Sequence, residues 1–214
     1  PPPAAGSVAP FASAVETALA PGDSEKLWSI RHAASPRLAA LPETRRSLQV
    51  IEDGCVPLER LGEYVRAVRE AARSRGIDVV LFGHAGDGHL HCNLLPELAR
   101  AGWEDAVASL LEEVTAAVAR LGGTPSGEHG DGRLRAPFLP AIYGAEILEL
   151  FHAVKSAFDP RGILNPGVKL GAAAPVARLK AGSGAAPIPA AIAAALRELE
   201  RQAGYATPRL TLLD

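Results

Sequence analysis

The 214-residue sequence contains no methionine and only two cysteines, Cys55 and Cys92. Two cysteines are too few for a disulfide framework, and they cannot supply the four thiolates of an iron–sulfur cluster. Cys92 lies among histidines, and we interpret it as a buried thiol rather than as a soft metal ligand. Because the chain begins without methionine, we expect it to be the C-terminal part of a longer protein.

An excess of one charge is also lacking, since 22 lysines and arginines nearly balance 24 acidic residues and leave a formal net charge of −2. This balance excludes a strongly basic surface, so we expect neither nucleic acid nor an anionic membrane as a partner. No apolar run approaches the roughly 20 residues that span a bilayer, and the start lacks the pattern of a secretory signal. A cytoplasmic protein with one buried core is the expectation.

Periodicity predicts an α+β fold, in which an antiparallel sheet has helices packed on one face and a helical C-terminal tail follows. Strands are predicted at 47–55, 77–82 and 89–95, and helices at 11–19, 25–38, 58–74, 103–121, 142–158 and 190–203. Residues 171–189 are rich in alanine, proline and glycine without periodicity, which is typical of a linker. We therefore expect a body at 1–170, and a linker with a terminal helix at 171–214.

Two glycine-rich segments, GHAGDGHLHCN (83–93) and SGEHGDG (126–132), hold four of the six histidines. In the first, Asp87 and Gly88 are the favoured pair for a two-residue type I′ turn. Such a turn would pair His84 with His91, whose Cβ atoms would then lie about 4.5–5.5 Å apart. His84, His89, His91 and Asn93 would share one face of the hairpin. Imidazoles at this spacing could bind one metal ion.

The second segment supplies a carboxylate and a further imidazole, Glu128 and His129. Two imidazoles and one carboxylate suit a borderline divalent ion and leave positions open for substrate. His129 is then available for proton transfer, since an imidazole with an ordinary pKa of about 6.5 is largely unprotonated near neutral pH. We therefore predict a metal site with an adjacent base.

Neither glycine-rich segment matches a dinucleotide-binding loop. Gly86 and Gly88, like Gly130 and Gly132, lack the third glycine at the required offset. We therefore do not expect this chain to hold a pyrophosphate by itself.

Three motifs in order, GHAGDGHLH (83–91), SGEHG (126–130) and KSAFDPRGILNPG (155–167), resemble the C-terminal domain of FAD-linked oxidases. That family includes D-lactate dehydrogenase, the glycolate oxidase flavin subunit and D-2-hydroxyglutarate dehydrogenase. The resemblance covers about residues 27 to 170. It implies a substrate-binding cap with a ferredoxin-like sheet, placed over FAD that a separate upstream domain or subunit mainly holds.

The resemblance also implies roles for individual residues. It assigns a divalent ion, zinc or a similar metal, to His84, His91 and Glu128, and the catalytic base to His129. It implies substrate contacts for Arg31 and Asn93, and it places Asn165 in the segment that returns towards FAD. Where the family usually has asparagine this chain has His89, so the pair His89 and His91 stays open as an alternative choice of ligands.

From these observations we expect the substrate- and metal-binding portion of a flavin-dependent 2-hydroxy acid dehydrogenase, which acts by base-assisted hydride transfer to FAD. Its substrate would be a small 2-hydroxy acid such as D-lactate, glycolate or D-2-hydroxyglutarate, and a homodimer is a further expectation. The isolated chain would be inactive without its FAD-binding domain. Two alternatives are a flavin-free metalloenzyme with two histidines and one carboxylate, and a non-catalytic binding module.

Overall fold

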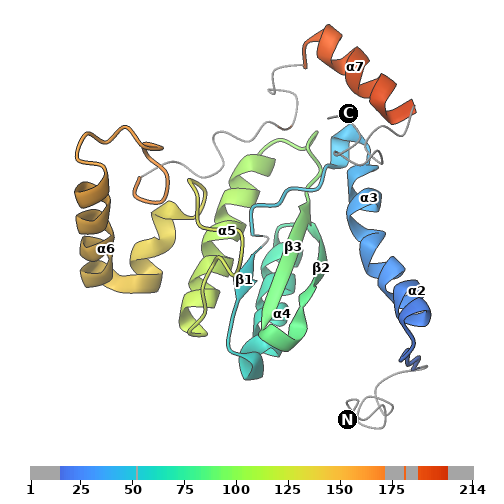
Figure 1. Ribbon diagram of the computed structural model, residues 1–214, viewed down its shortest axis with the longest axis horizontal. Coiled ribbons are helices and arrows are strands. Elements are labelled where there is room, and N and C mark those ends of the chain that lie inside the picture. Colours follow the sequence, from blue (N-terminus) through green and yellow to red (C-terminus); the bar gives the residue numbers. More distant parts are fainter. Residues whose placement is uncertain (1–14, 52, 172–180, 182–187, 202–214) are drawn as a thin grey trace. The chain divides into compact units, whose positions relative to one another are not determined.

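The computed structural model describes residues 15–51, 53–171, 181 and 188–201 (Figure 1). The chain divides into two compact units, residues 1–177 and 178–214. In the second unit the described helix is α7 (Ala190–Arg201), which agrees with the predicted terminal helix. The predicted linker at 171–189 falls largely outside the described residues, and the domain boundary after residue 170 stays a prediction.

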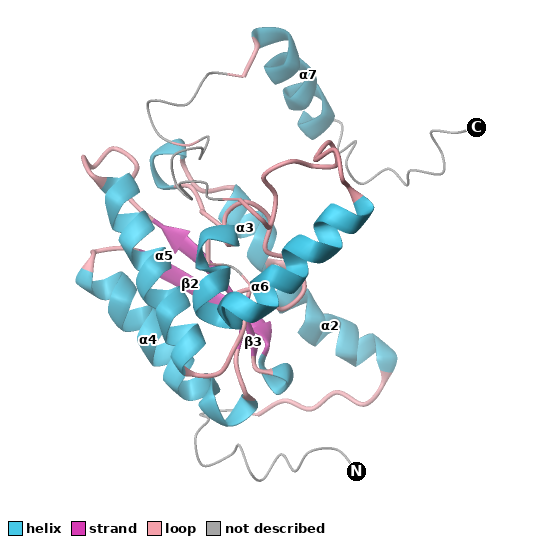
Figure 2. Ribbon diagram, turned by 90° about the vertical axis from the view of Figure 1, so that its left-hand side faces the viewer, coloured by secondary structure: helices cyan, strands magenta, loops and turns pink. Residues whose placement is uncertain are grey.

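The first unit is built around an antiparallel sheet, with strands β1 (Gly54–Cys55), β2 (Asp78–His84) and β3 (His89–Leu95) in the order β1-β3-β2. Helices α4 (Leu61–Ser74) and α5 (Trp103–Arg120) pack against each other and cover one face of the sheet (Figures 1 and 2). Their apolar stripes supply much of the core. The predicted α+β fold with an antiparallel sheet is confirmed.

Other elements differ in part from the prediction. Among the described residues, the first unit also has the α-helices α2 (Pro21–His32), α3 (Ala34–Ala39) and α6 (Leu139–Phe158). The single helix predicted at 25–38 is therefore two helices. The strand predicted at 47–55 is reduced to β1 and an isolated bridge between Leu48 and Leu94. Of the helix predicted at 11–19, residues 15–19 have no regular structure and the rest lies outside the described residues.

Strand β3 is buried on both faces, and its alternation separates the core from the site. Leu90, Cys92 and Leu94 lie on one face, and His89, His91 and Asn93 lie on the other. Cys92 is fully buried, and desolvation raises the pKa of its thiol to about 12. A thiol at this position stays protonated, which agrees with its interpretation as a packing residue.

The turn between β2 and β3 contradicts the predicted two-residue hairpin. Residues Ala85–Asp87 form a 3-10 turn, and Gly88 alone adopts a left-handed conformation, with φ of 68°. A type I′ turn would require positive φ at Asp87 as well. His84 therefore pairs with His89, and Phe82 lies opposite His91. The predicted pairing of His84 with His91 was wrong by two residues.

Alanine at position 88 should strongly destabilise the fold. A Cβ atom there would overlap the carbonyl oxygen of Val56, whose amide nitrogen donates a 3.0 Å hydrogen bond to the Gly88 carbonyl. Left-handed φ and overpacking together should lower the free energy of unfolding by about 2–3 kcal/mol. Gly86→Ala is the matched control, because a Cβ at Gly86 meets nothing within 4 Å. Urea unfolding of both variants measures the effect, and equal stabilities would contradict the assigned turn.

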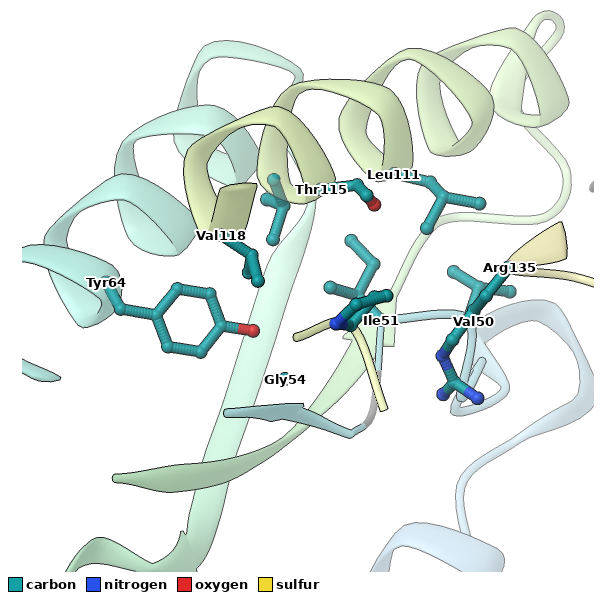
Figure 3. Close-up of a pocket in the computed structure, with 10 residues that line it drawn as sticks. Val50, Ile51, Gly54, Tyr64, Leu111, Thr115, Val118 and Arg135 are labelled. Carbon is teal, nitrogen blue, oxygen red and sulfur yellow. The ribbon is translucent and has the colours of Figure 1, made fainter. Parts of the chain in front are cut away.

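Strand β1 is held against α4 by a close contact that only glycine permits. Tyr64, fully buried on α4, directs its hydroxyl towards Gly54 beside a small core cavity (Figure 3). A Cβ atom at Gly54 would overlap that hydroxyl. This contact fixes the backbone next to Asp53, an acidic residue that becomes important for the site.

Candidate metal and substrate site

The site forms where the hairpin of β2 and β3 meets the segment 126–132. The face of the hairpin that carries His84, His89, His91 and Asn93, called the histidine face below, is turned towards that segment. Glu128 Oε1 lies 3.3 Å from His91 Nε2, 3.4 Å from His129 Nε2 and 3.9 Å from His84 Nε2. The ring of His91 stacks on that of His129, with centroids 5.4 Å apart. The structure thus brings together the four residues predicted from sequence as ligands and base, although their roles stay predictions.

Two overlapping sets of side chains could hold a metal ion, each with ligand atoms within 4.8 Å of one another. The first set is His84, His89, His91 and Glu128, and the second is Asp53, His91, Glu128 and His129. His91 and Glu128 belong to both. Imidazole nitrogens with a carboxylate oxygen are the donors of many zinc sites, so the residues present fit a divalent ion.

Asp53, which sequence reasoning did not single out, lies beneath this cluster with no exposed surface. Its carboxylate lies 2.8 Å from His89 Nε2 and accepts hydrogen bonds from the Ser126 hydroxyl at 2.7 Å and from the backbone amides of Glu128 at 3.1 Å and His129 at 2.8 Å. The sequence carries no clear signal for this role, since Glu52 and Asp53 are two adjacent acids after residues 48–51, and acids are rarely fully buried unless they are paired.

These hydrogen bonds set the ionisation of Asp53. Burial by itself would raise the pKa of the carboxyl, but the bonds from Ser126, His129, His89 and Glu128 outweigh it and hold the pKa at about 2. The group is therefore ionised at neutral pH. Because a carboxylate can only accept, the proton of this contact resides on Nε2 of His89.

The depressed pKa of Asp53 predicts an acid-sensitive contribution to stability. The folded pKa lies below the ordinary value of 3.8, so the unfolded chain binds more protons in this range. Stability is therefore full above about pH 4 and falls as the pH approaches 2, by on the order of 2 kcal/mol in total. Urea unfolding of the metal-free chain from pH 6 to pH 3 should show a steeper loss for the wild type than for Asp53→Asn. Parallel pH profiles would contradict this role of Asp53.

Arg31, a predicted substrate contact, lies next to the histidine cluster. Its guanidinium carbon is 4.2 Å from the centroid of the Phe82 ring, and that ring lies 5.5 Å from the ring of His91. A cation stacked on an aromatic face keeps its N–H groups available at its edge. Arg31 is thus placed one aromatic ring away from a predicted metal ligand.

Asn93, the second predicted substrate contact, lines a cavity of about 380 Å³. The other lining residues are Ser35, Leu38, Ala39, Leu41, Arg46, Ser47 and Gln49. Ser47 donates a 2.9 Å hydrogen bond to Asn93 Oδ1, whereas Asn93 Nδ2 is buried without a hydrogen-bond partner among the described residues. Because buried donors are normally satisfied, this amide is suited to a polar group of a ligand.

Asn165 lies in the segment 159–167 after α6, called the closing turn below. It is exposed there and has a positive φ of 49°. The turn is held by Asp159, which accepts hydrogen bonds from the amides of Ile163 at 3.0 Å and Leu164 at 2.9 Å and from Lys155 Nζ at 2.6 Å. The apolar side chains of this segment do not anchor it, because Ile163 and Leu164 are 61% and 58% exposed.

A search of the described residues finds no helix with the length and apolar character that a membrane crossing requires.

Comparison with known proteins identifies relatives for most of the chain. The family model for FAD linked oxidases, C-terminal domain, matches residues 6–168. Glycolate oxidase subunit GlcD of Bacillus subtilis is 35% identical over 156 residues, which cover 73% of this chain and 32% of that protein. D-2-hydroxyglutarate dehydrogenase of Escherichia coli is 34% identical over 143 residues, covering 67% of this chain and 14% of that protein.

D-lactate dehydrogenase of Archaeoglobus fulgidus is 37% identical over 123 residues, covering 58% of this chain and 27% of that protein. The chain thus matches about a third or less of the length of these relatives. The family model, however, spans well over half of the chain. The resemblance found in the sequence is therefore confirmed, and the chain belongs to the family of FAD linked oxidases, C-terminal domain.

Proposed function

We propose that this chain is the substrate- and metal-binding portion of a flavin-dependent 2-hydroxy acid dehydrogenase of the glycolate, D-lactate or D-2-hydroxyglutarate type. The observation that carries the proposal is the convergence of His84, His91, His129 and Glu128 within one site. Membership of the FAD-linked oxidase family and the names of the relatives support the reaction class.

We infer that His84, His91 and Glu128 hold a divalent ion, with zinc as the proposed metal. When bound, the ion would act as a Lewis acid that lowers the pKa of the substrate hydroxyl. The chemistry of the three donors fits this role, because two imidazoles and a carboxylate leave coordination positions for a substrate. Glu128 is about half exposed, so a small acid could reach it from solvent.

His129 is the proposed general base. Its Nε2 lies 3.4 Å from Glu128 Oε1, so a hydroxyl bound beside Glu128 would be within reach of this nitrogen. Arg31 would pair with the substrate carboxylate, since a guanidinium can donate two parallel hydrogen bonds to it. Asn93 would donate from Nδ2 to a polar group of a substrate that extends into the adjoining cavity.

The flavin would be held mainly outside this chain. FAD, when bound, would accept the hydride from the substrate α-carbon. The chain contributes no dinucleotide-binding motif. We propose that Asn165, exposed in the closing turn, faces the flavin, and that an upstream domain or subunit binds it. The cytoplasmic location and the homodimer stay predictions from the sequence.

The test is a spectrum and a substrate screen of a protein that joins this chain to an upstream FAD-binding segment. We expect a yellow protein whose flavin absorption bleaches when one of D-lactate, glycolate or D-2-hydroxyglutarate is added without an acceptor. Turnover that depends on metal in a colourless protein would instead favour the flavin-free metalloenzyme. Absence of both colour and turnover would favour the binding module. The 214-residue chain alone should neither retain stoichiometric FAD nor oxidise these acids.

A further inference from the structure

Asp53 connects three parts of the site that are distant in the sequence. His89 is 36 residues away, and Ser126, Glu128 and His129 are 73, 75 and 76 residues away. The carboxylate is fully buried, and both of its oxygens accept hydrogen bonds. A buried ionised carboxylate needs such bonds, and in return it strongly favours the backbone arrangement that provides them.

The hydrogen bonds act on the backbone from which the functional side chains project. The amides of Glu128 and His129 are consecutive, and both point at the Asp53 carboxylate. The amide of Gly127 donates a further 2.8 Å bond to the Asp53 carbonyl oxygen. With three successive amides bound to one residue, the directions of the Glu128 and His129 side chains depend on Asp53.

His89 completes this arrangement from the hairpin side. The residue is 5% exposed, and its ring lies against Gly127, where a Cβ atom would come within 2.8 Å of His89 Cδ2. Its Nε2 carries the proton given to Asp53, so only Nδ1 of this ring keeps a lone pair. His89 thus donates to Asp53 through Nε2, and Asp53 acts as the acceptor.

We propose that Asp53 is a positioning residue that, together with His89, clamps the segment 126–129 onto the hairpin and so orients Glu128 and His129. It does not itself ligate the ion. This inference rests on the proposed metal site of His84, His91 and Glu128, and it removes Asp53 from the second of the two overlapping ligand sets. It assigns His89 the role of partner to Asp53, and the His89 variants below test whether Nδ1 of that ring ligates the ion.

Two readouts on the 214-residue chain test the clamp, namely amide hydrogen exchange measured by NMR without metal, and Zn²⁺ affinity measured by competition with a chelator. Asp53→Asn should accelerate exchange at the Glu128 and His129 amides at least about tenfold. It should also weaken Zn²⁺ binding by about 10–100-fold, which is typical when a residue that hydrogen-bonds and orients a metal ligand is removed. Asp159→Asn is the matched control. Asp159 is a buried acid that caps two backbone amides in the closing turn, and its variant should leave both readouts unchanged.

Substitutions at His89 keep the test decisive if Asp53→Asn does not fold. The side-chain amide of glutamine can place an N–H donor where His89 has Nε2–H, so His89→Gln should preserve slow exchange and Zn²⁺ affinity. Leucine offers no donor, so His89→Leu should weaken Zn²⁺ binding about tenfold or more. Loss of Zn²⁺ with His89→Gln would show that His89 is a ligand and overturn the proposal. Unchanged exchange and affinity in Asp53→Asn would also overturn it. If the wild type binds no Zn²⁺, the proposed metal site is wrong. The exchange rates alone then still show whether Asp53 holds the segment 126–129 on the hairpin.

Discussion

Replacing Glu128 by alanine is expected to remove most of the bound metal. Its Oε1 is the atom on which three imidazoles converge, at 3.3–3.9 Å from His91, His129 and His84. Without it the proposed ligands that remain are imidazoles, and the nearby Asp53 carboxylate is already bound by His89, Ser126 and backbone amides. Removal of a residue that only hydrogen-bonds a metal ligand already lowers metal affinity by about 10–100-fold. Removal of the ligand Glu128 itself should therefore weaken Zn²⁺ binding by at least about 100-fold.

Elemental analysis and chelator competition on the purified chain measure this effect. Glu112→Ala is the matched control, because it makes the same chemical change at an exposed position of α5 and should leave metal content unchanged. His84→Ala should behave like Glu128→Ala. Full metal content in Glu128→Ala would show that residues other than Glu128 bind the ion.

The second large effect is expected for His129→Ala in the flavin-containing protein. Turnover should fall by about 10²–10⁴, the usual consequence of losing a general base, while metal content stays at the wild-type level. The separation of the two readouts is important, because His129 belongs to one of the two possible ligand sets. Its ring also stacks on His91, so a structural effect must be distinguished from a chemical one.

His152→Ala provides the control for His129→Ala. His152 is an exposed histidine on α6, and its removal should change neither turnover nor metal content. Loss of metal together with turnover in His129→Ala would mean that the proposed base is a ligand. Unchanged turnover would mean that another group takes the proton.

The sequence was sufficient to predict which side chains share the histidine face. It was not sufficient to predict which residues of β2 and β3 pair with each other. Side chains on a strand alternate with a period of two, so a shift by two residues changes the pairing and keeps every side chain on its face. His84, His89, His91 and Asn93 therefore lie together as predicted, even though His84 pairs with His89. The Asp87-Gly88 dipeptide was misleading because the chain forms a longer turn with only Gly88 in the left-handed region.

The residues missed by sequence reasoning depend on contacts distant in the chain. The partners of Asp53 come from residues 89 and 126–129, and no local pattern at position 53 indicates them. The closing turn shows the same limitation. Its prolines and glycines are typical of a turn. Whether apolar side chains or Asp159 hold that turn depends on which side chains the rest of the fold buries.

The most direct test of the proposed metal site is a crystal structure of the chain loaded with Zn²⁺, with the ion located by its anomalous scattering. We expect one ion bound by His84, His91 and Glu128, with Zn–N distances of about 2.0–2.1 Å and Asp53 still hydrogen-bonded to His89. An ion ligated by Asp53 or His89, or no ion at this cluster, would contradict it.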